Sequence, residues 1–406
     1  MTKDPSHVHV PRPLKPFARG FVDWLARHGY TPISSAFQLH LMAHWSRWLA
    51  GERRDLVVLS MTDVERFLRA RRRAGYTQYL SAKAMQPMLA SLREQGMTVT
   101  SHPTTPRGPI ESVLTRYRHY LIHERGLGGA TARGYLDAVR PFVRRRITED
   151  GLAVEWASVS AADVTAFVVD HTPHQSRGTA KLTVTALRSF LTFLHIDGLL
   201  TQSLTAAVPS VAGWRLAGIP KALQPAQVHA LLASCDRRTR TGRRDFAVLT
   251  LLVRLGLRAG EVAALRLDDI DWRAGTILIR GKGPQVEPLP WPADVGEAVV
   301  AYLRQGRPAT AIDRTVFVRV KAPHRALSSA GISNIVAVAA RRAGLGVIHA
   351  HRLRHTTATQ LLRAGAPLPE IGQLLRHRRA LTTAIYAKVD RGALRTIARP
   401  WPGGVA

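Results

Sequence analysis

The spacing of apolar residues predicts that most of the chain is helical. Val228, Leu231 and Leu232 recur on one helical face, and residues 246–257 form a longer apolar segment with the same periodicity. After residue 328 the chain shows the helical pattern again. The last third of the chain is therefore expected to be mainly α-helical.

One segment within this helical region has the pattern of a β-hairpin. Residues 275–280 and 286–290 are short extended runs, and they flank the glycine-rich turn Gly281-Lys282-Gly283. This places Lys282 near the tip of the predicted hairpin. The expected fold class is mainly α and multi-domain, with helical N-terminal bundles followed by an α-rich domain that carries a small antiparallel sheet.

Two stretches rich in Pro, Gly, Ser and Thr divide the chain, at residues 98–109 and at about 203–225. Such stretches do not sustain a helix and are typical of linkers. We therefore expect three domains. These are an N-terminal helical domain at 1–106, a second helical domain at 110–205 and a C-terminal domain at 220–406.

The two helical domains share a local sequence pattern. Residues 60–68 align with residues 160–168, and residues 88–96 align with residues 190–198. In the first pair, Ser60 and Ser160 each precede an apolar helical run and are followed three positions later by Asp63 and Asp163, which is the pattern of a helix-capping box. The similarity indicates either a duplication or a chance likeness between two helical bundles.

The charge of the chain indicates a polyanionic partner. Its 58 Lys and Arg residues against 28 Asp and Glu residues give a formal net charge of +30. The excess is +18 in residues 221–406 (30 basic, 12 acidic), +9 in residues 1–107 (16 and 7) and +3 in residues 108–220 (12 and 9). Nucleic acid fits this imbalance, and the alternative is a solvated surface in an Arg-rich proteome.

Cysteine content and hydropathy indicate a cytoplasmic protein. Cys235 is the only cysteine, so an internal disulfide and a cysteine-based metal cage are excluded. Residues 1–15 are polar and proline-rich, with no apolar signal core. No apolar run approaches the ~18 residues that a membrane helix needs. We therefore expect no membrane association and a nucleoid-associated location of the bacterial type.

Four separated segments of the C-terminal third carry side chains suited to phosphoryl transfer. Two arginine forks match the non-bridging oxygens of a phosphodiester, and a tyrosine can act as a nucleophile if neighbouring histidines activate its phenol. A lysine on a turn can give a proton to a departing alkoxide. The residues are Arg258, Lys282, His351, Arg354, His377 and Tyr386.

These segments resemble the signature of the tyrosine recombinase (phage integrase) family. The matching motifs are Arg-x-x-Glu at 258–261, Gly-Lys-Gly at 281–283, His-x-Leu-Arg-His at 351–355 and Leu-x-His at 375–377, followed by Tyr386. The intervals of 24 residues (258 to 282), 23 residues (354 to 377) and 9 residues (377 to 386) also resemble those of the family. The resemblance covers about 221–395, and more loosely 110–205 as the family's core-binding, SAM-like DNA-binding domain.

For the phosphate, the resemblance implies a clamp of two arginines. Arg258 and Arg354 would hold the scissile phosphate and stabilise its pentacoordinate transition state. His377 would donate a hydrogen bond to the same phosphate, and Glu261 would brace Arg258 without touching DNA.

For the bond changes, the resemblance implies attack by the tyrosine on phosphorus. Tyr386 would form a 3′-phosphotyrosyl link and release a 5′-hydroxyl, with His351 assisting its deprotonation. Lys282 would protonate the leaving oxygen. Attack by a 5′-hydroxyl of a partner duplex would reseal the strand, so the resemblance implies no ATP, no metal and no other cofactor.

The chain departs from the family pattern beside His377. The preceding residue is often Gly in the family but is Arg376 here, and Arg378 and Arg379 follow. This change puts the local turn in question and suggests an additional phosphate contact. A metal pair of His351 and His355 is disfavoured, because the zinc-protease motif needs a Glu where this chain has Arg352.

The resemblance implies duplex DNA as the partner, held between the helical bundles and the catalytic domain. It also implies a homotetrameric synapse on DNA, with an additional recombinase or directionality protein as a further partner. The expected role is integration, excision or transposition of a mobile element. Two alternatives stay open: a DNA-binding accessory protein without catalysis, and a relaxing enzyme like the type IB topoisomerases.

Overall fold

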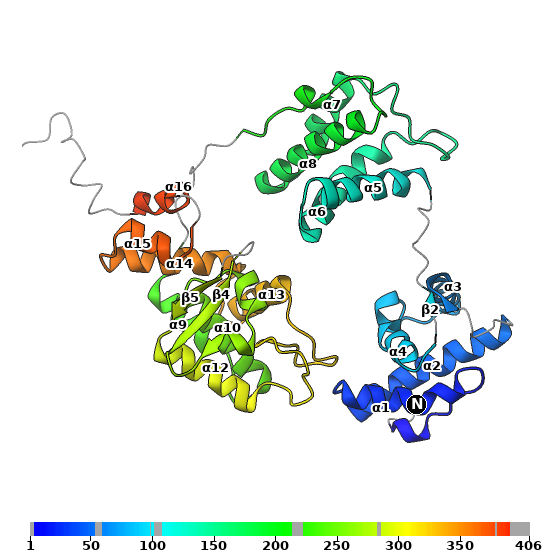
Figure 1. The fold of residues 1–406 in the computed structure, drawn as a ribbon, viewed down its shortest axis with the longest axis horizontal. Coiled ribbons are helices and arrows are strands. Elements are labelled where there is room, and N and C mark those ends of the chain that lie inside the picture. Colours follow the sequence, from blue (N-terminus) through cyan, green and yellow to red (C-terminus); the bar gives the residue numbers. More distant parts are fainter. Residues whose placement is uncertain are drawn as a thin grey trace, which may run out of the picture. The chain divides into compact units, whose positions relative to one another are not determined.

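A computed structural model describes residues 4–52, 59–97, 99–100, 108–212, 222–281, 286–377 and 380–389. Contacts divide the chain into two compact units, one formed by residues 1–99 and 218–406 and the other by residues 100–217. The predicted fold class is confirmed, because the described residues are mainly helical and include a small antiparallel sheet (Figure 1). The three-domain division remains a prediction.

The N-terminal residues form a helical bundle around their own apolar core. Trp45, Phe21 and Met88 are fully buried in this core. A short pair of strands, which the sequence did not predict, accompanies the helices. The elements are α1 (Ala18–Arg27), α2 (Pro32–Gly51), β1 (Leu59–Ser60), α3 (Met61–Arg73), α4 (Ala82–Glu94) and β2 (Val99–Thr100).

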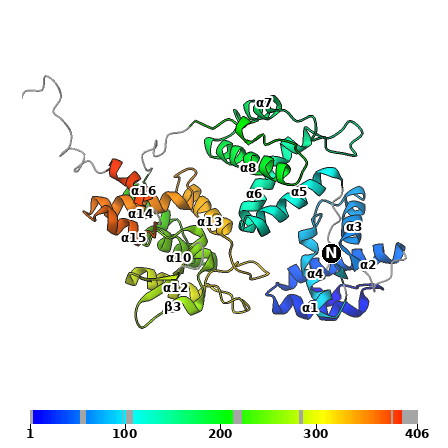
Figure 2. The same ribbon diagram turned by 45° about the horizontal axis from the view of Figure 1, so that its top comes forward.

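The second unit is also a helical bundle, with a core that includes Tyr117, Phe142 and Phe190. Helix α6 packs against both α5 and α8, and the turned view shows these three helices side by side (Figure 2). Its helices are α5 (Pro109–His119), α6 (Gly129–Arg144), α7 (Ala161–His171) and α8 (Arg177–Ile196).

The predicted capping boxes are confirmed in both bundles. The Ser60 amide donates to the Asp63 carboxylate at 3.0 Å and the Asp63 amide donates to the Ser60 hydroxyl at 3.3 Å. The equivalent distances for Ser160 and Asp163 are 2.9 and 3.3 Å. Each box satisfies two backbone N–H groups at the start of a helix, which stabilises it by about 1 kcal/mol. The capped helix is the third of the four described α-helices in each bundle.

The C-terminal residues form a helical domain with a three-stranded sheet. Its helices are α9 (Pro225–Ala233), α10 (Arg240–Arg254), α11 (Ala259–Ala264), α12 (Ala293–Gln305), α13 (Ser329–Arg342), α14 (Ala350–Arg363), α15 (Leu368–Leu374) and α16 (Ala380–Thr383). Its strands are β3 (Ile270–Asp271), β4 (Thr276–Arg280) and β5 (Val286–Pro290). A 3-10 helix at Ala384–Val389 follows α16.

The predicted β-hairpin is confirmed, and it is extended by a third strand. Strand β4 pairs antiparallel with β5 and with β3, and Ile277 lies opposite Leu289. Ile277 and Ile279 face the core while Leu278 between them is exposed, which is the alternation expected of a sheet with one buried face.

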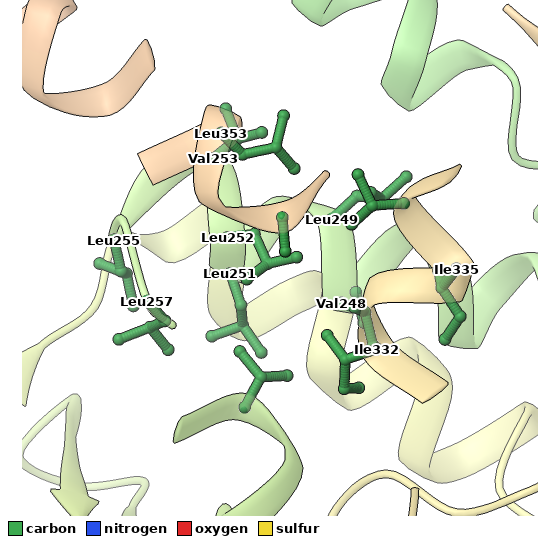
Figure 3. Close-up of a cluster of buried hydrophobic side chains, with 14 of the residues drawn as sticks. Val248, Leu249, Leu251, Leu252, Val253, Leu255, Leu257, Ile332, Ile335 and Leu353 are labelled. Carbon is green, nitrogen blue, oxygen red and sulfur yellow. The ribbon is translucent and has the colours of Figure 1, made fainter. Parts of the chain in front are cut away.

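Helix α10 lies at the centre of this domain. It contacts α9, α11, α12, α13 and α14. Figure 3 shows its apolar side chains from Val248 to Val253 gathered beside Ile332 and Ile335 of α13 and Leu353 of α14. Burying such side chains stabilises the domain by roughly 1.5–3 kcal/mol each, so this packing fixes where α14 lies. Among the described residues, no helix is long and apolar enough to cross a membrane.

Candidate active site

Helix α14 carries three of the side chains that matter for chemistry. His351, Arg354 and His355 share one helical face because they are three and four positions apart. Two buried threonines attach this helix to the core. The Thr357 hydroxyl donates to the Val253 carbonyl at the end of α10 at 2.7 Å, and the Thr356 hydroxyl accepts from the Leu223 amide at 2.9 Å.

Arg354 connects two backbone turns from its buried position. Its side chain is 1% exposed, Nη1 donates to the Gly256 carbonyl at 2.7 Å, and Nη2 donates to the Leu375 carbonyl. Gly256 precedes Arg258 by two residues, and Leu375 precedes His377 by two. Gly256 has a φ of 57°, and a Cβ there would lie 2.6 Å from the Leu375 side chain, so any other residue would be strained and crowded.

Arg258 lies at the first of these turns, at the N-cap of α11. Its Nη1 donates to Glu261 Oε1 at 2.6 Å, and its backbone amide donates to Glu261 Oε2 at 2.8 Å. The Arg258 side chain is 43% exposed, whereas that of Glu261 is 5% exposed. This geometry is the one expected if a buried carboxylate braces an arginine that still faces solvent.

Arg376 lies at the second turn, which it forms in the left-handed conformation. Its φ is 52°, a value that glycine adopts easily and that other residues seldom adopt. The turn is therefore kept although glycine is missing. The Arg376 side chain turns inward and Nη2 donates to Glu261 Oε2 at 2.9 Å.

These turns surround a cavity of about 1510 Å³. The residues that line it come from α11, from both hairpin strands (Glu287 lies on β5), from α13, α14, α15 and α16, and from the segments beside them. Those with polar or charged side chains include Arg258, Glu261, Arg280, Ser329, Ser333, His351, Arg354, Gln373, Arg376, His377 and Thr383. Four of the six predicted catalytic residues thus line one cavity that is rich in cationic side chains.

His377 is held by a residue of the following helix. Its Nδ1 lies 2.7 Å from the Thr383 hydroxyl, and Thr383 is buried. This contact fixes one side of the imidazole and leaves Nε2 available to the cavity. The ring is parallel to that of Tyr386, with 6.4 Å between centroids and 5° between planes.

Tyr386 lies beside the cavity but is not one of the described residues that line it. Its side chain is 1% exposed and packs with Ala358, Ile371 and Leu375. The hydroxyl lies 2.8 Å from Nδ1 of His355. The phenol is therefore buried and hydrogen-bonded to a histidine.

Burial and neighbouring arginines change the ionisation of these groups. Burial, followed by the nearby His351 and Arg354, lowers the pKa of His355 to about 4, so this ring is neutral at pH 7. Burial, followed by Arg354 and Arg258, lowers the pKa of His377 to about 4. Burial raises the pKa of Tyr386, and Arg354 opposes that rise only in part.

The cations are affected as well. Burial, together with the charge of Arg258, lowers the pKa of Arg354 to about 10, which still leaves it charged at neutral pH. Burial favours the neutral form of Glu261, but Arg376 and the hydrogen bonds from Arg258 outweigh it and lower the pKa of this carboxyl. The described lining residues include four arginines and two glutamates, so the cavity carries net positive charge, as an anion site requires.

Comparisons with known proteins identify the family. Residues 221–392 match the phage integrase family, and residues 114–198 match the N-terminal SAM-like domain of phage integrases. A Sinorhizobium fredii protein provisionally named integrase/recombinase y4rA is 40% identical over 391 residues, covering 94% of this chain and 93% of the relative. Tyrosine recombinase XerC of Bacillus pumilus is 31% identical over 286 residues, covering 68% of this chain and 91% of XerC.

The chain belongs to the tyrosine recombinase family. Solved structures of similar fold include the XerH site-specific recombinase bound to difH, with a TM-score of 0.56 and 18% identity over 71% of this chain and 96% of XerH. A lambda integrase dimer bound to a COC' core site gives a TM-score of 0.53 and 18% identity over 79% of this chain and 89% of that one. The family expected from the motifs is confirmed.

The predicted site of this recombinase also involves Lys282 and the two histidines of α14. Lys282 lies outside the described residues, although the preceding Gly281 lines the cavity. His355 is not among the predicted catalytic residues, and it is the residue whose ring bonds the Tyr386 hydroxyl. His351, which was expected to assist Tyr386, contacts the His355 ring at 4.4 Å between centroids. The i, i+4 spacing of the two histidines was the available signal.

Proposed function

We propose that this recombinase cleaves and rejoins DNA strands at specific sites through a 3′-phosphotyrosyl intermediate. The observation that carries the proposal is the convergence of Arg258, Arg354, His351 and His377 on one cationic cavity, with a hydrogen-bonded tyrosine beside it. These groups supply what metal-free phosphoryl transfer needs: anion clamps and a nucleophile with a basic partner.

In the proposed reaction, the two arginines hold the non-bridging oxygens of the scissile phosphate. Arg354 uses two of its N–H groups on backbone carbonyls and keeps the others for the phosphate. Arg258 is the more exposed of the two and meets the phosphate from the solvent side. His377 donates from the nitrogen opposite Thr383.

Tyr386 is the proposed nucleophile. Its oxygen attacks phosphorus as the bond to the 5′ oxygen breaks, and Lys282 protonates that oxygen. Neutral His355 holds the phenol at rest, and His351 beside it takes the phenolic proton during the attack. The phosphotyrosyl bond conserves the energy of the phosphodiester, so a 5′-hydroxyl can reverse the step without ATP. Because Tyr386 is buried beside the cavity, its hydroxyl must leave His355 to reach phosphorus.

We propose that residues 110–205 are the core-binding domain, that 220–406 are the catalytic domain, and that 1–106 are a second bundle related to the core-binding one. The shared capping boxes support this relation.

On α3, Arg66, Arg69 and Arg73 are exposed and lie on one helical face, opposite the buried Phe67 and Leu68. This arginine stripe would contact DNA phosphates.

The arginine stripe can be tested through salt dependence. Each lost phosphate contact reduces the log–log salt slope of DNA binding by about 0.9. Replacing the three arginines by glutamine should therefore reduce the slope by up to ~2.7 in the whole protein. Glutamine at three other exposed arginines, Arg273, Arg304 and Arg341, is the matched control. An equal change in both variants would mean that only net charge matters.

The assembly on DNA follows by analogy with structures of similar fold. One of these is a lambda integrase tetramer bound to a Holliday junction, with a TM-score of 0.53 and 16% identity. We propose that four copies of this chain act on two duplexes in the cytoplasm, during integration, excision or transposition of a mobile element. The presence of inverted repeats flanking its coding region would support that role and would supply the substrate.

A nicked suicide substrate built from such a repeat tests the function. The wild-type protein should form a covalent protein–DNA adduct, and Tyr386→Phe should form none. An adduct excludes an accessory protein without catalysis, and products joined between two duplexes exclude an enzyme that only relaxes DNA. If the Phe variant forms the adduct as well, another residue is the nucleophile.

A further inference from the structure

The turn before His377 contains a residue that its backbone conformation does not favour. Among the described non-glycine residues, only Arg376 and Tyr79 have a positive φ. A non-glycine residue persists in this conformation when its surroundings compensate for the strain, and such positions cluster at functional sites. The contacts of the Arg376 side chain indicate what compensates here.

Arg376 belongs to a closed ring of interactions with Glu261 and Arg258. Arg376 Nη2 donates to Glu261 Oε2 at 2.9 Å, and Arg258 Nη1 donates to Glu261 Oε1 at 2.6 Å. Arg258 Nη2 lies 3.4 Å from the Arg376 carbonyl, which completes the ring. A further bond, from Arg376 Nη1 to the Leu374 carbonyl at 2.8 Å, holds the guanidinium in place.

The charges in this ring indicate a role for Arg376. Arg258 and Glu261 alone sum to zero (+1 and −1), so the carboxylate would cancel much of the attraction between Arg258 and a phosphate. Arg376 adds +1 and shares the same carboxylate. The Arg376 and Glu261 side chains are only 7% and 5% exposed, so solvent screens their interaction little.

We propose that Arg376 is a positioning residue for Arg258. By neutralising Glu261 and holding its second oxygen, it fixes the Arg258 guanidinium and leaves its charge for the scissile phosphate. This inference rests on the proposed function of the cavity. It also assigns a role to the residue where the chain departs from the glycine common in the family.

The exposure of the Arg258 and Arg376 side chains indicates which of them is placed to contact DNA. The Arg258 side chain is 43% exposed and that of Arg376 is 7% exposed, with both of its terminal nitrogens bonded to protein. Its Nε is buried and has no hydrogen-bond partner within the part of the chain that the structure describes, which is a feature that direct contact with a phosphate would explain. DNA affinity and cleavage rate distinguish the two roles.

Arg376→Gly is the main test, because glycine adopts the φ of this turn without strain and the fold should be kept. With the nicked substrate at saturating concentration, we expect single-turnover adduct formation to slow by roughly tenfold to hundredfold, as for a misplaced catalytic group. DNA affinity should change less than about twofold. Arg376→Lys, which keeps the charge beside Glu261, should recover part of the rate.

A double-variant cycle tests whether Arg376 acts through Glu261. Glu261→Gln should slow cleavage, and Arg376→Gly added to it should cause little further loss. Multiplicative losses, a wild-type rate in Arg376→Gly, or a loss confined to DNA affinity would each overturn the proposal. Absence of any adduct from the wild-type protein would instead overturn the proposed function, so the two failures are distinguishable.

Discussion

Arg354 and Tyr386 are each 1% exposed, but the structure holds them in different ways. Arg354 donates to the carbonyls of Gly256 and Leu375, in two turns that are themselves fixed to packed helices. Tyr386 lies on a short 3-10 helix within a small apolar cluster, and among the described residues its hydroxyl has one hydrogen bond, to His355. The proposed phosphate clamp is therefore held by its bonds to two turns, whereas the proposed nucleophile is held by one hydrogen bond and a small apolar cluster.

The largest expected effect comes from breaking the clamp. Arg354→Lys replaces a fork with a point charge, so one buried carbonyl loses its donor, which costs about 1–3 kcal/mol of unfolding free energy. Adduct formation should fall by roughly a hundredfold to a thousandfold. Urea unfolding and single-turnover cleavage measure the two effects.

Arg258→Lys is the matched control for that experiment. The Arg258 side chain is 43% exposed, so its loss should reduce stability by less than about 1 kcal/mol while still slowing cleavage. Equal destabilisation by the two lysine variants would show that Arg354 does not join the two turns.

The clamp and the nucleophile also differ in how well the sequence predicts them. Motif spacing predicted Arg258, Glu261 and Arg354. The contacts between Arg258 and Glu261 follow from a helix N-cap and an i, i+3 pair, whereas those of Arg354 reach carbonyls far away in the chain. The bond between His355 and Tyr386 joins residues 31 positions apart and depends on how α14 packs against the final 3-10 helix. Helical periodicity places His351 and His355 on the same face, so it could not select between them.

A second prediction concerns the hydrogen bond between His355 and the Tyr386 hydroxyl. In His355→Leu the Tyr386 hydroxyl stays buried without a partner, so unfolding free energy should fall by about 1–3 kcal/mol. Tyr386→Phe added to this variant removes the unpaired hydroxyl, and the double variant should be less destabilised than the sum of the single ones. Strict additivity in urea unfolding would mean that the bond does not stabilise the tyrosine.

Acid should reduce the stability of the fold through the two buried histidines near Tyr386. His355 and His377 have pKa values lowered to about 4, below the ~6.5 of an unfolded chain. Between these values the unfolded state binds more protons, so stability is complete above pH ~6.5 and is lost as pH falls towards 4. Urea unfolding from pH 7 to 4.5 should show this loss. His355→Leu should have a shallower dependence, and an unchanged slope would argue against the lowered pKa of His355.

The smallest expected effect concerns Thr383, which connects His377 in the cavity to the segment that carries Tyr386. His377 lines the cavity beside the arginines, yet its Nδ1 is held by Thr383, which belongs to α16 just before Tyr386. Thr383→Val keeps the shape of the side chain and removes the hydroxyl, so the imidazole loses its fixed orientation. A neutral hydrogen bond contributes about 1 kcal/mol, so cleavage should slow by roughly threefold to tenfold. DNA affinity should be unchanged.

Thr383→Ser, which keeps the hydroxyl, should cleave at nearly the wild-type rate. If Val and Ser slow cleavage equally, packing at this position matters and the hydrogen bond to His377 does not.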